Sequence, residues 1–178
     1  MRLSELESFL VRPARPDDAA AIGAVHVRAW QAAYRGVMPD EYLDSLNADE
    51  RADMWRDRIA RDELPPLLVA ETEGVVVGFA AFGRERPSPE QRGAAELGAI
   101  NLDPDHWGKG IGRSLLREVM SALWSLGYRE AILWVVPQNT RARSLYESEG
   151  WRADGAVASD EVLGVTVTEM RYTTELHG

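Results

Sequence analysis

The sequence of 178 residues contains no cysteine and only three histidines. The absence of cysteine excludes disulfide bonds, a thiol nucleophile and thiolate metal ligands. The three histidines (His26, His106 and His177) are far apart in the sequence, so we expect no bound metal. No apolar run approaches the roughly 20 residues that span a bilayer, and the charged N-terminus lacks the apolar segment of a secretory signal. We therefore expect a cytoplasmic protein without membrane contact.

Positive charge is also scarce, with 20 Lys and Arg against 29 Asp and Glu and a net charge of −9. This balance argues against nucleic acid as a partner, because nucleic-acid binding requires a basic face. It favours a cationic partner through electrostatic steering, although plain solubility is the simpler explanation. The hydrophobic content of 45% and charged content of 28% are ordinary for a globular protein. The length predicts one domain over residues 1–178.

Hydrophobic periodicity and turn residues predict strands that alternate with helices. We expect strands at residues 9–14, 67–71, 75–83, 94–102 and 131–136, with a final pair near 151–156 and 162–172. We expect helices from Asp17 or Asp18 to residue 35 and at 48–62, 111–126 and 139–149, a loop or short turn at 37–47, and an exposed loop at 84–93. Gly98, inside a strand, indicates a bulge.

Three glycines, Gly108, Gly110 and Gly112, alternate with other residues where the helix expected at 111–126 begins. A strand, a glycine-rich turn and a helix start form an anion site, because unpaired N–H groups and the helix dipole favour negative charge there. Glycine also lets a pyrophosphate approach the backbone. The spacing excludes a Walker loop, since Gly110 follows Lys109, and it excludes the dinucleotide fingerprint, whose third glycine would replace Arg113.

This loop resembles the motif Gln/Arg-x-x-Gly-x-Gly/Ala of the GNAT superfamily of acetyl-CoA-dependent N-acetyltransferases. Gly110 and Gly112 match its small positions, whereas Trp107 replaces the usual Gln or Arg. A second stretch resembles the family's other strong motif at Asn139, Ala142, Arg143, Leu145, Tyr146, Gly150 and Trp151. The resemblance implies an α/β fold with a mixed, mostly antiparallel sheet of six or seven strands. In that fold the sheet is splayed between strands four and five and carries helices on both faces.

The resemblance implies acetyl-CoA as the cosubstrate. Its pyrophosphate would lie on the N–H groups of the glycine loop, and its pantetheine arm would lie along the fourth strand, where one N–H group would also bind the oxyanion. The side chains of Lys109 and Arg113 either add positive charge or are solvated surface groups, and Asn139 is equally explained as a helix N-cap. The expected cofactor-binding residues are Ile100, Leu102, Gly108, Lys109, Gly110, Ile111, Gly112, Arg113 and Asn139.

By the same resemblance, Tyr146 is the expected general acid, because a phenol near pKa 10 can protonate a departing thiolate. A core aromatic is the alternative. Glu96 stands fourteen residues before Gly110, where one branch of the superfamily carries its catalytic base. The alternative for Glu96 is a polar residue on the outward face of a strand. The other known glutamate position of the family is Trp134 here, and His26 is a reserve base.

Trp30, Tyr34 and Trp55 lie on or near the first two expected helices, which line the acceptor side in this superfamily. They could form an apolar or cation-attracting pocket, although core packing explains at least one of them. We expect acetyl transfer to a primary amine of a small molecule or peptide by direct attack, and a homodimer through the last strands remains open. A non-catalytic acyl-CoA sensor and a nucleotide-phosphate protein are the alternatives.

Overall fold

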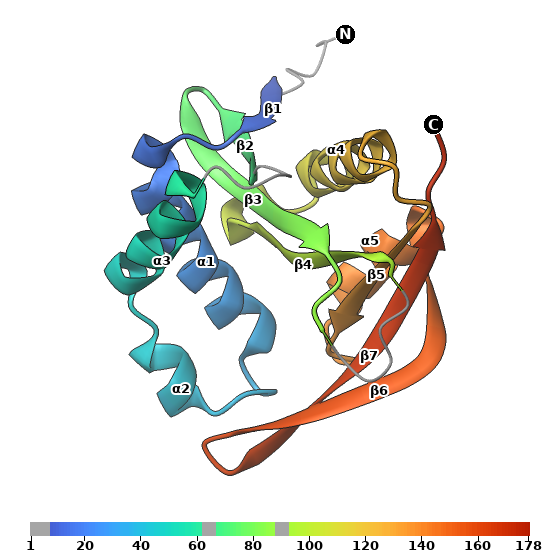
Figure 1. Ribbon diagram of the computed structural model, residues 1–178. Coiled ribbons are helices and arrows are strands. Elements are labelled where there is room, and N and C mark those ends of the chain that lie inside the picture. The colour runs from blue at the N-terminus through green and yellow to red at the C-terminus, as the bar shows by residue number, and fades with distance from the viewer. Residues whose placement is uncertain (1–7, 62–66, 88–92) are drawn as a thin grey trace, which may run out of the picture.

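The computed structural model describes residues 8–61, 67–87 and 93–178, so residues 1–7 and residues 88–92 of the expected 84–93 loop lie outside this part of the chain. The described strands form one mixed seven-stranded sheet in the order β1-β2-β3-β4-β5-β7-β6, which is drawn in Figure 1. The strands are β1 (Phe9–Pro13), β2 (Leu68–Thr72), β3 (Val75–Arg84), β4 (Ala95–Leu102), β5 (Glu130–Val135), β6 (Arg152–Val162) and β7 (Val165–Glu175). The helices are α1 (Ala19–Tyr34), α2 (Asp40–Ser45), α3 (Ala48–Ala60), α4 (Ile111–Ser125) and α5 (Thr140–Ser148), with 3-10 turns η1 (Pro16–Asp18) and η2 (Pro104–His106).

Helices cover both faces of the sheet, as the sequence predicts. The apolar face of α4, which includes Leu115, Leu116, Val119 and Leu123, is buried in one cluster with Tyr146 of α5. On the opposite face, α1 and α3 pack over β2 and β3 through a second cluster that includes Trp55. Within the described residues, no helix is long and apolar enough to cross a membrane.

The sheet divides between β4 and β5. These strands are parallel, but they pair only at Ala95 with Ala131 and at Glu96 with Ile132. The bulge expected at Gly98 is confirmed, because Ala81 faces Ala99 and Phe82 faces Leu97, so that Gly98 has no partner on β3. The bulge bends β4 away from β5. A gap therefore opens beyond residue 96 at the centre of the sheet.

Two expectations about local structure were wrong. The expected loop at 37–47 contains the short helix α2, which the sequence hides because only Leu43 of its residues is buried. The last two strands are longer than expected and meet in a two-residue turn at Leu163 and Gly164, both with positive φ. Strand β6 is an edge strand exposed on most of its length, so it lacks the alternation that reveals a half-buried strand.

Candidate acetyl-coenzyme A and acceptor site

The backbone N–H groups of Ile100 and Leu102 on β4 point away from β3, toward the gap between β4 and β5. The N–H group of Asp103 donates to the Val77 carbonyl of β3 at 2.7 Å. Because successive strand residues direct their N–H groups to opposite sides, Leu102 and Ile100 direct theirs away from β3. The carbonyl of Leu102 accepts a hydrogen bond from the Trp107 indole at 3.0 Å. The Trp107 indole thus stabilises the end of β4. Trp107, which replaces the usual Gln or Arg of the family motif, therefore has a structural role.

The glycine loop leads directly into α4. Gly108 and Gly110 have φ values of +78° and +83°, in the left-handed region that glycine adopts without steric cost. Gly110 is the N-cap of α4. A methyl group built on either glycine would meet no protein atom within 4 Å. The loop therefore presents open space above the free N–H groups of a helix N-terminus, which fits a diphosphate.

The side chains around the loop have other partners. Ile111 is fully buried beneath the loop, so only its main chain can serve a ligand. The Arg113 Nε atom is 3.0 Å from Glu149 of the α5 C-terminus, which directs this guanidinium toward α5. Lys109 is exposed. Sequence reasoning missed Arg141, whose guanidinium carbon lies 4.4 Å from the centre of the Trp107 ring and adds positive charge beside the loop.

Tyr146, Asn139 and Tyr34 are brought together at the same end of the sheet. Tyr146 is 6% exposed, and its burial, with the nearby Tyr34 hydroxyl, raises the pKa of its phenol above the usual range. The Asn139 Oδ1 atom caps α5 by accepting from the Ala142 N–H group at 3.2 Å. Its side chain also hydrogen-bonds the Tyr34 hydroxyl at the C-terminal end of α1. Burial raises the pKa of Tyr34, so both phenols are neutral proton donors.

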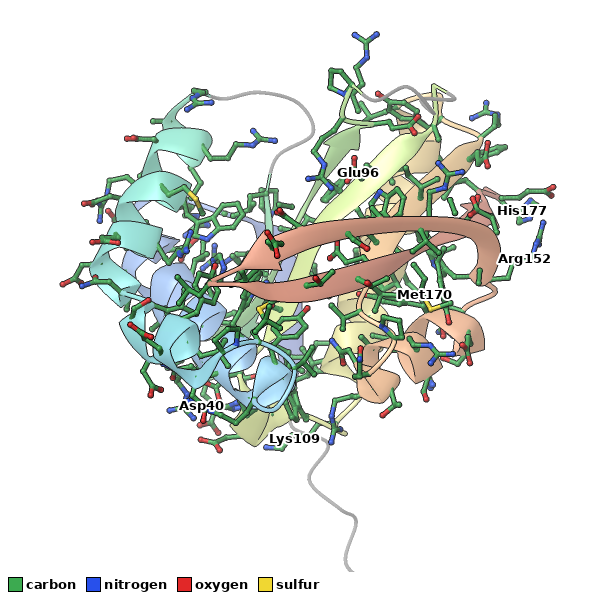
Figure 2. The ribbon with its side chains drawn as sticks, turned by 90° about the horizontal axis from the view of Figure 1, so that it is seen from below. Asp40, Glu96, Lys109, Arg152, Met170 and His177 are labelled. Carbon is green, nitrogen blue, oxygen red and sulfur yellow. The ribbon has the colours of Figure 1, made fainter. Side chains whose placement is uncertain are left out.

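Glu96 is 4% exposed and forms an ion pair with Arg86. Its Oε1 atom accepts from the Arg86 Nε atom at 2.8 Å, and its Oε2 atom accepts from the Arg86 backbone N–H group at 2.9 Å. These two residues line a pocket of about 210 Å³ together with Glu85, Pro87, Ile132 and Trp134. Figure 2 shows Glu96 on the opposite side of the β6–β7 hairpin from Lys109 in that view. Sequence reasoning missed Arg86, because it precedes Glu96 by ten residues and no motif links them.

The three aromatic residues expected on the acceptor side have different surroundings. Trp55 is buried between α1 and α3, and its Nε1 atom donates to the His26 Nδ1 atom at 3.0 Å. This placement supports core packing for Trp55. The hydrogen bond also occupies one nitrogen of His26. Trp30 and Tyr34 are half-buried with ring centres 5.0 Å apart. They pack with Val167 of β7, so the hairpin contacts α1.

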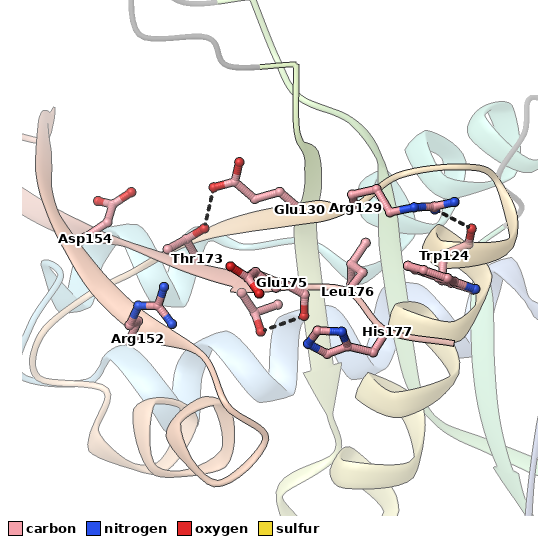
Figure 3. A pocket seen from close by; sticks show the side chains of 10 residues that line it. Trp124, Arg129, Glu130, Arg152, Asp154, Thr173, Glu175, Leu176 and His177 are labelled. Atoms are coloured by element: carbon pink, nitrogen blue, oxygen red, sulfur yellow. Dashed lines mark hydrogen bonds between the residues drawn. The ribbon is translucent and has the colours of Figure 1, made fainter.

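A hollow of about 730 Å³ lies elsewhere on the described surface (Figure 3). It is lined by the C-terminal end of α4, the start of β5 and the end of β7, at residues such as Trp124, Glu130, Thr173 and His177. Helix α4 separates it from the glycine loop by about 20 Å of helix length. The Thr173 hydroxyl donates to Glu130 at 2.8 Å, and the hollow contains none of the expected site residues.

Comparisons with known proteins agree with this geometry. Residues 25–151 match the acetyltransferase (GNAT) family. The chain is 39% identical over 131 residues to the N-acetyltransferase YuaI of Bacillus subtilis, covering 72% of each protein. It is 32% identical over 143 residues to the L-amino acid N-acyltransferase MnaT of Escherichia coli, covering 79% of this chain and 78% of MnaT.

A solved structure has the same fold. YncA from Salmonella typhimurium, determined with its cofactor acetyl-CoA, superposes with a TM-score of 0.72 at 24% identity, covering 95% of this chain and 94% of that one. The fold and the family match define a class, the N-acetyltransferases. The chain belongs to the GNAT family within that class.

Proposed function

We propose that the protein transfers the acetyl group of acetyl-CoA to the primary amine of a small molecule, with an L-amino acid or a close analogue as the acceptor. The observation that carries this proposal is the gap between β4 and β5, which lies beside an open glycine loop at the α4 N-terminus. Family membership supports the reaction type. The name of MnaT, an L-amino acid N-acyltransferase, supports the acceptor class.

In this proposal the N–H groups of residues 108–113 hold the diphosphate. The main chain at Ile100 and Leu102 holds the pantetheine arm, in the manner of an added strand. One of these two N–H groups also stabilises the oxyanion that forms when the amine nitrogen attacks the thioester carbon. Asn139, whose side chain caps α5 and hydrogen-bonds Tyr34, is proposed to contact the ligand beside Tyr146.

Tyr146 is the proposed general acid. When the carbon–sulfur bond breaks, its hydroxyl protonates the sulfur, and the phenolate regains a proton from the nitrogen that has just formed the new bond. The raised pKa of Tyr146 keeps it protonated through the neutral range, ready to donate.

Glu96 is the proposed base for the acceptor ammonium. The Arg86 guanidinium contacts Oε1 of Glu96, and the Arg86 backbone N–H group donates to Oε2. In this proposal the guanidinium moves away from Oε1, and that oxygen then accepts the proton. The Arg86 side chain is 73% exposed, which leaves it room to move when an acceptor enters.

The test is a thiol-release assay with acetyl-CoA against a panel of amino acids, other small amines and peptides, with the acetylated product identified by mass. We expect turnover with L-amino acids. Tight CoA binding without turnover against any amine would contradict the enzyme and favour the acyl-CoA sensor.

A further inference from the structure

Glu169 is an ionisable side chain within electrostatic range of Glu96, and it has no part in the reaction proposed above. Glu169 lies on β7, two residues before Arg171, which is paired with Trp134 of β5. Because side chains alternate along a strand, Glu169 lies on the same face of the sheet as Arg171 and Trp134. Trp134 lines the pocket that contains Glu96. Glu169 therefore lies on the face of the sheet that carries the pocket lined by Trp134 and Glu96.

The electrostatic neighbours of Glu169 come from four elements or their flanks. It lies within electrostatic range of Arg86 after β3, Glu96 of β4 and Asp160 of β6. It is also within range of Tyr34 of α1. Glu169 is thus within electrostatic range of both the Glu96–Arg86 ion pair and Tyr34.

The charges around Glu169 are unbalanced. It is half-buried, and it forms no hydrogen bond or ion pair with any described residue. Arg86 is already paired with Glu96, and Arg171 is paired with Asp154 at 2.8 Å. Burial, together with the charges of Glu96 and Asp160, raises the pKa of Glu169, and Arg86 offsets this only in part. Glu96, Glu169 and Arg86 together carry one uncompensated negative charge, which one ammonium group would neutralise.

The surroundings of Glu169 also limit what can carry that ammonium group. Val167, on the same face of β7, packs with Trp30 and Tyr34 in one apolar cluster. A ligand at Glu169 therefore has apolar and aromatic surface on one side and the ion pair on the other. This combination suits a cation attached to an apolar side chain.

We propose that Glu169 is the carboxylate that binds the ammonium group of an acceptor with an apolar side chain, beside the Glu96–Arg86 pair. The proposal rests on the acetyl-transfer function and adds the selectivity of its acceptor site. Glu169 contributes to binding and orientation, and the proton leaves through Glu96. Loss of Glu169 should therefore raise KM for the acceptor more than it lowers kcat.

The test compares Glu169→Gln with the wild-type protein on L-methionine and on 3-(methylthio)propylamine, which has the same side chain and ammonium but no carboxylate. We expect KM to rise about tenfold or more for both acceptors, as for a lost charge-assisted hydrogen bond, with little change in kcat. Glu169→Asp should recover part of the affinity. Glu161→Gln is the matched control, because it removes the same charge from an exposed site on the opposite face of the same hairpin.

CoA affinity, measured by calorimetry, verifies that each variant is folded. An unchanged acceptor KM in Glu169→Gln, or an equal rise in Glu161→Gln, would overturn the proposal. If the wild-type protein acetylates other amines but neither probe, the Glu169 proposal is also overturned. The acetyltransferase function is then still supported. Absence of turnover with every amine would instead contradict the function itself.

Discussion

At the scale of single residues, burial keeps two ionisable side chains neutral. Tyr146 is buried in the α4–α5 core, which raises the pKa of its phenol. Burial, with a smaller effect of Arg51, lowers the pKa of His26 to about 4. Tyr146 is thereby a proton donor at neutral pH, and His26 is an uncharged acceptor for the Trp55 indole.

Replacing Tyr146 with Phe should lower kcat by about 10²-fold or more, because a positioned general acid contributes about 10²–10⁴-fold. CoA affinity should hardly change, since the hydroxyl acts on the departing sulfur. Steady-state kinetics and calorimetry measure the two effects. Tyr172→Phe is the control, because it removes another tyrosine hydroxyl from a ring 6.3 Å away in the same core. Equal kcat in Tyr146→Phe and the wild-type protein would exclude Tyr146 as the acid.

Replacing Glu96 with Gln should depress the rate most at low pH, where the amine is protonated and a base is needed. At high pH the free amine attacks without that base, so the variant and the wild-type rates should converge. The measurement is the pH dependence of kcat/KM. A profile parallel to that of the wild-type protein would rule out Glu96 as the base.

The lowered pKa of His26 predicts a loss of stability in acid. The unfolded chain binds a proton near pH 6.5, whereas the folded chain binds it only near pH 4. His26 therefore does not lower the free energy of unfolding above pH 6.5. As the pH falls from 6.5 toward 4, protonation of His26 in the unfolded chain lowers this free energy by up to about 3 kcal/mol. His26→Gln keeps an acceptor for Trp55 but does not titrate, so urea unfolding at pH 7 and pH 4.5 should differ less than in the wild-type protein. An equal difference in both proteins would contradict this assignment.

A sequence motif predicts the local conformation of its own residues, whereas contacts between distant segments leave no pattern in the sequence. The glycine loop has the open conformation that its spacing predicts. Arg86 follows β3 and Glu169 lies on β7, and only the pairing of β3, β4, β5 and β7 brings both residues within electrostatic range of Glu96. Trp55 looks like a pocket residue in the sequence, but its indole is used inside the core.

At the scale of elements, the glycine loop and α4 act as one unit in binding. Gly110→Ala should weaken CoA binding, because the new methyl group enters the space above the loop and the backbone is strained at φ +83°. Gly127→Ala is the matched control, since it has φ +94° and equally open surroundings at the other end of α4. Both should lose about 1–2 kcal/mol of stability, but only Gly110→Ala should lose CoA affinity in calorimetry. Equal CoA affinity in the two variants would contradict the site.

The elements were predictable where they bury a regular face. Helix α4 shows a clear apolar stripe, and β5 is a continuous apolar run, so both lie close to their expected bounds. Helix α2 buries one residue and follows Pro39, which leaves no periodicity to detect. Leu163, in the turn of the β6–β7 hairpin, has φ +47°. A leucine at this position does not predict a tight turn, because such turns usually contain Asn, Asp or Gly.

At the scale of the whole molecule, the site joins segments that are far apart in the sequence. In the proposed site, Tyr34, Glu96, Tyr146 and Glu169 come from α1, β4, α5 and β7. The gap between β4 and β5 exists because these strands separate after two residue pairs. A ligand bound there contacts both halves of the sheet. Its binding should therefore stabilise the fold as a whole.

CoA at about 100 times its Kd should stabilise the protein by about 2.7 kcal/mol. For a chain of this size that corresponds to a rise in Tm of about 5–10 °C. Thermal unfolding with and without CoA measures the rise. ATP at the same concentration is the control, because it offers phosphates without a pantetheine arm. An equal rise with ATP would favour the nucleotide-phosphate protein.

The most direct measurement is a crystal structure of the protein with CoA. We predict the pantetheine arm between β4 and β5, hydrogen-bonded to the main chain at Ile100 and Leu102, with the diphosphate on the N–H groups of residues 108–113 and the sulfur beside Tyr146. CoA bound elsewhere, for example in the hollow beside His177, with the gap between β4 and β5 empty, would contradict both the proposed reaction and its residues.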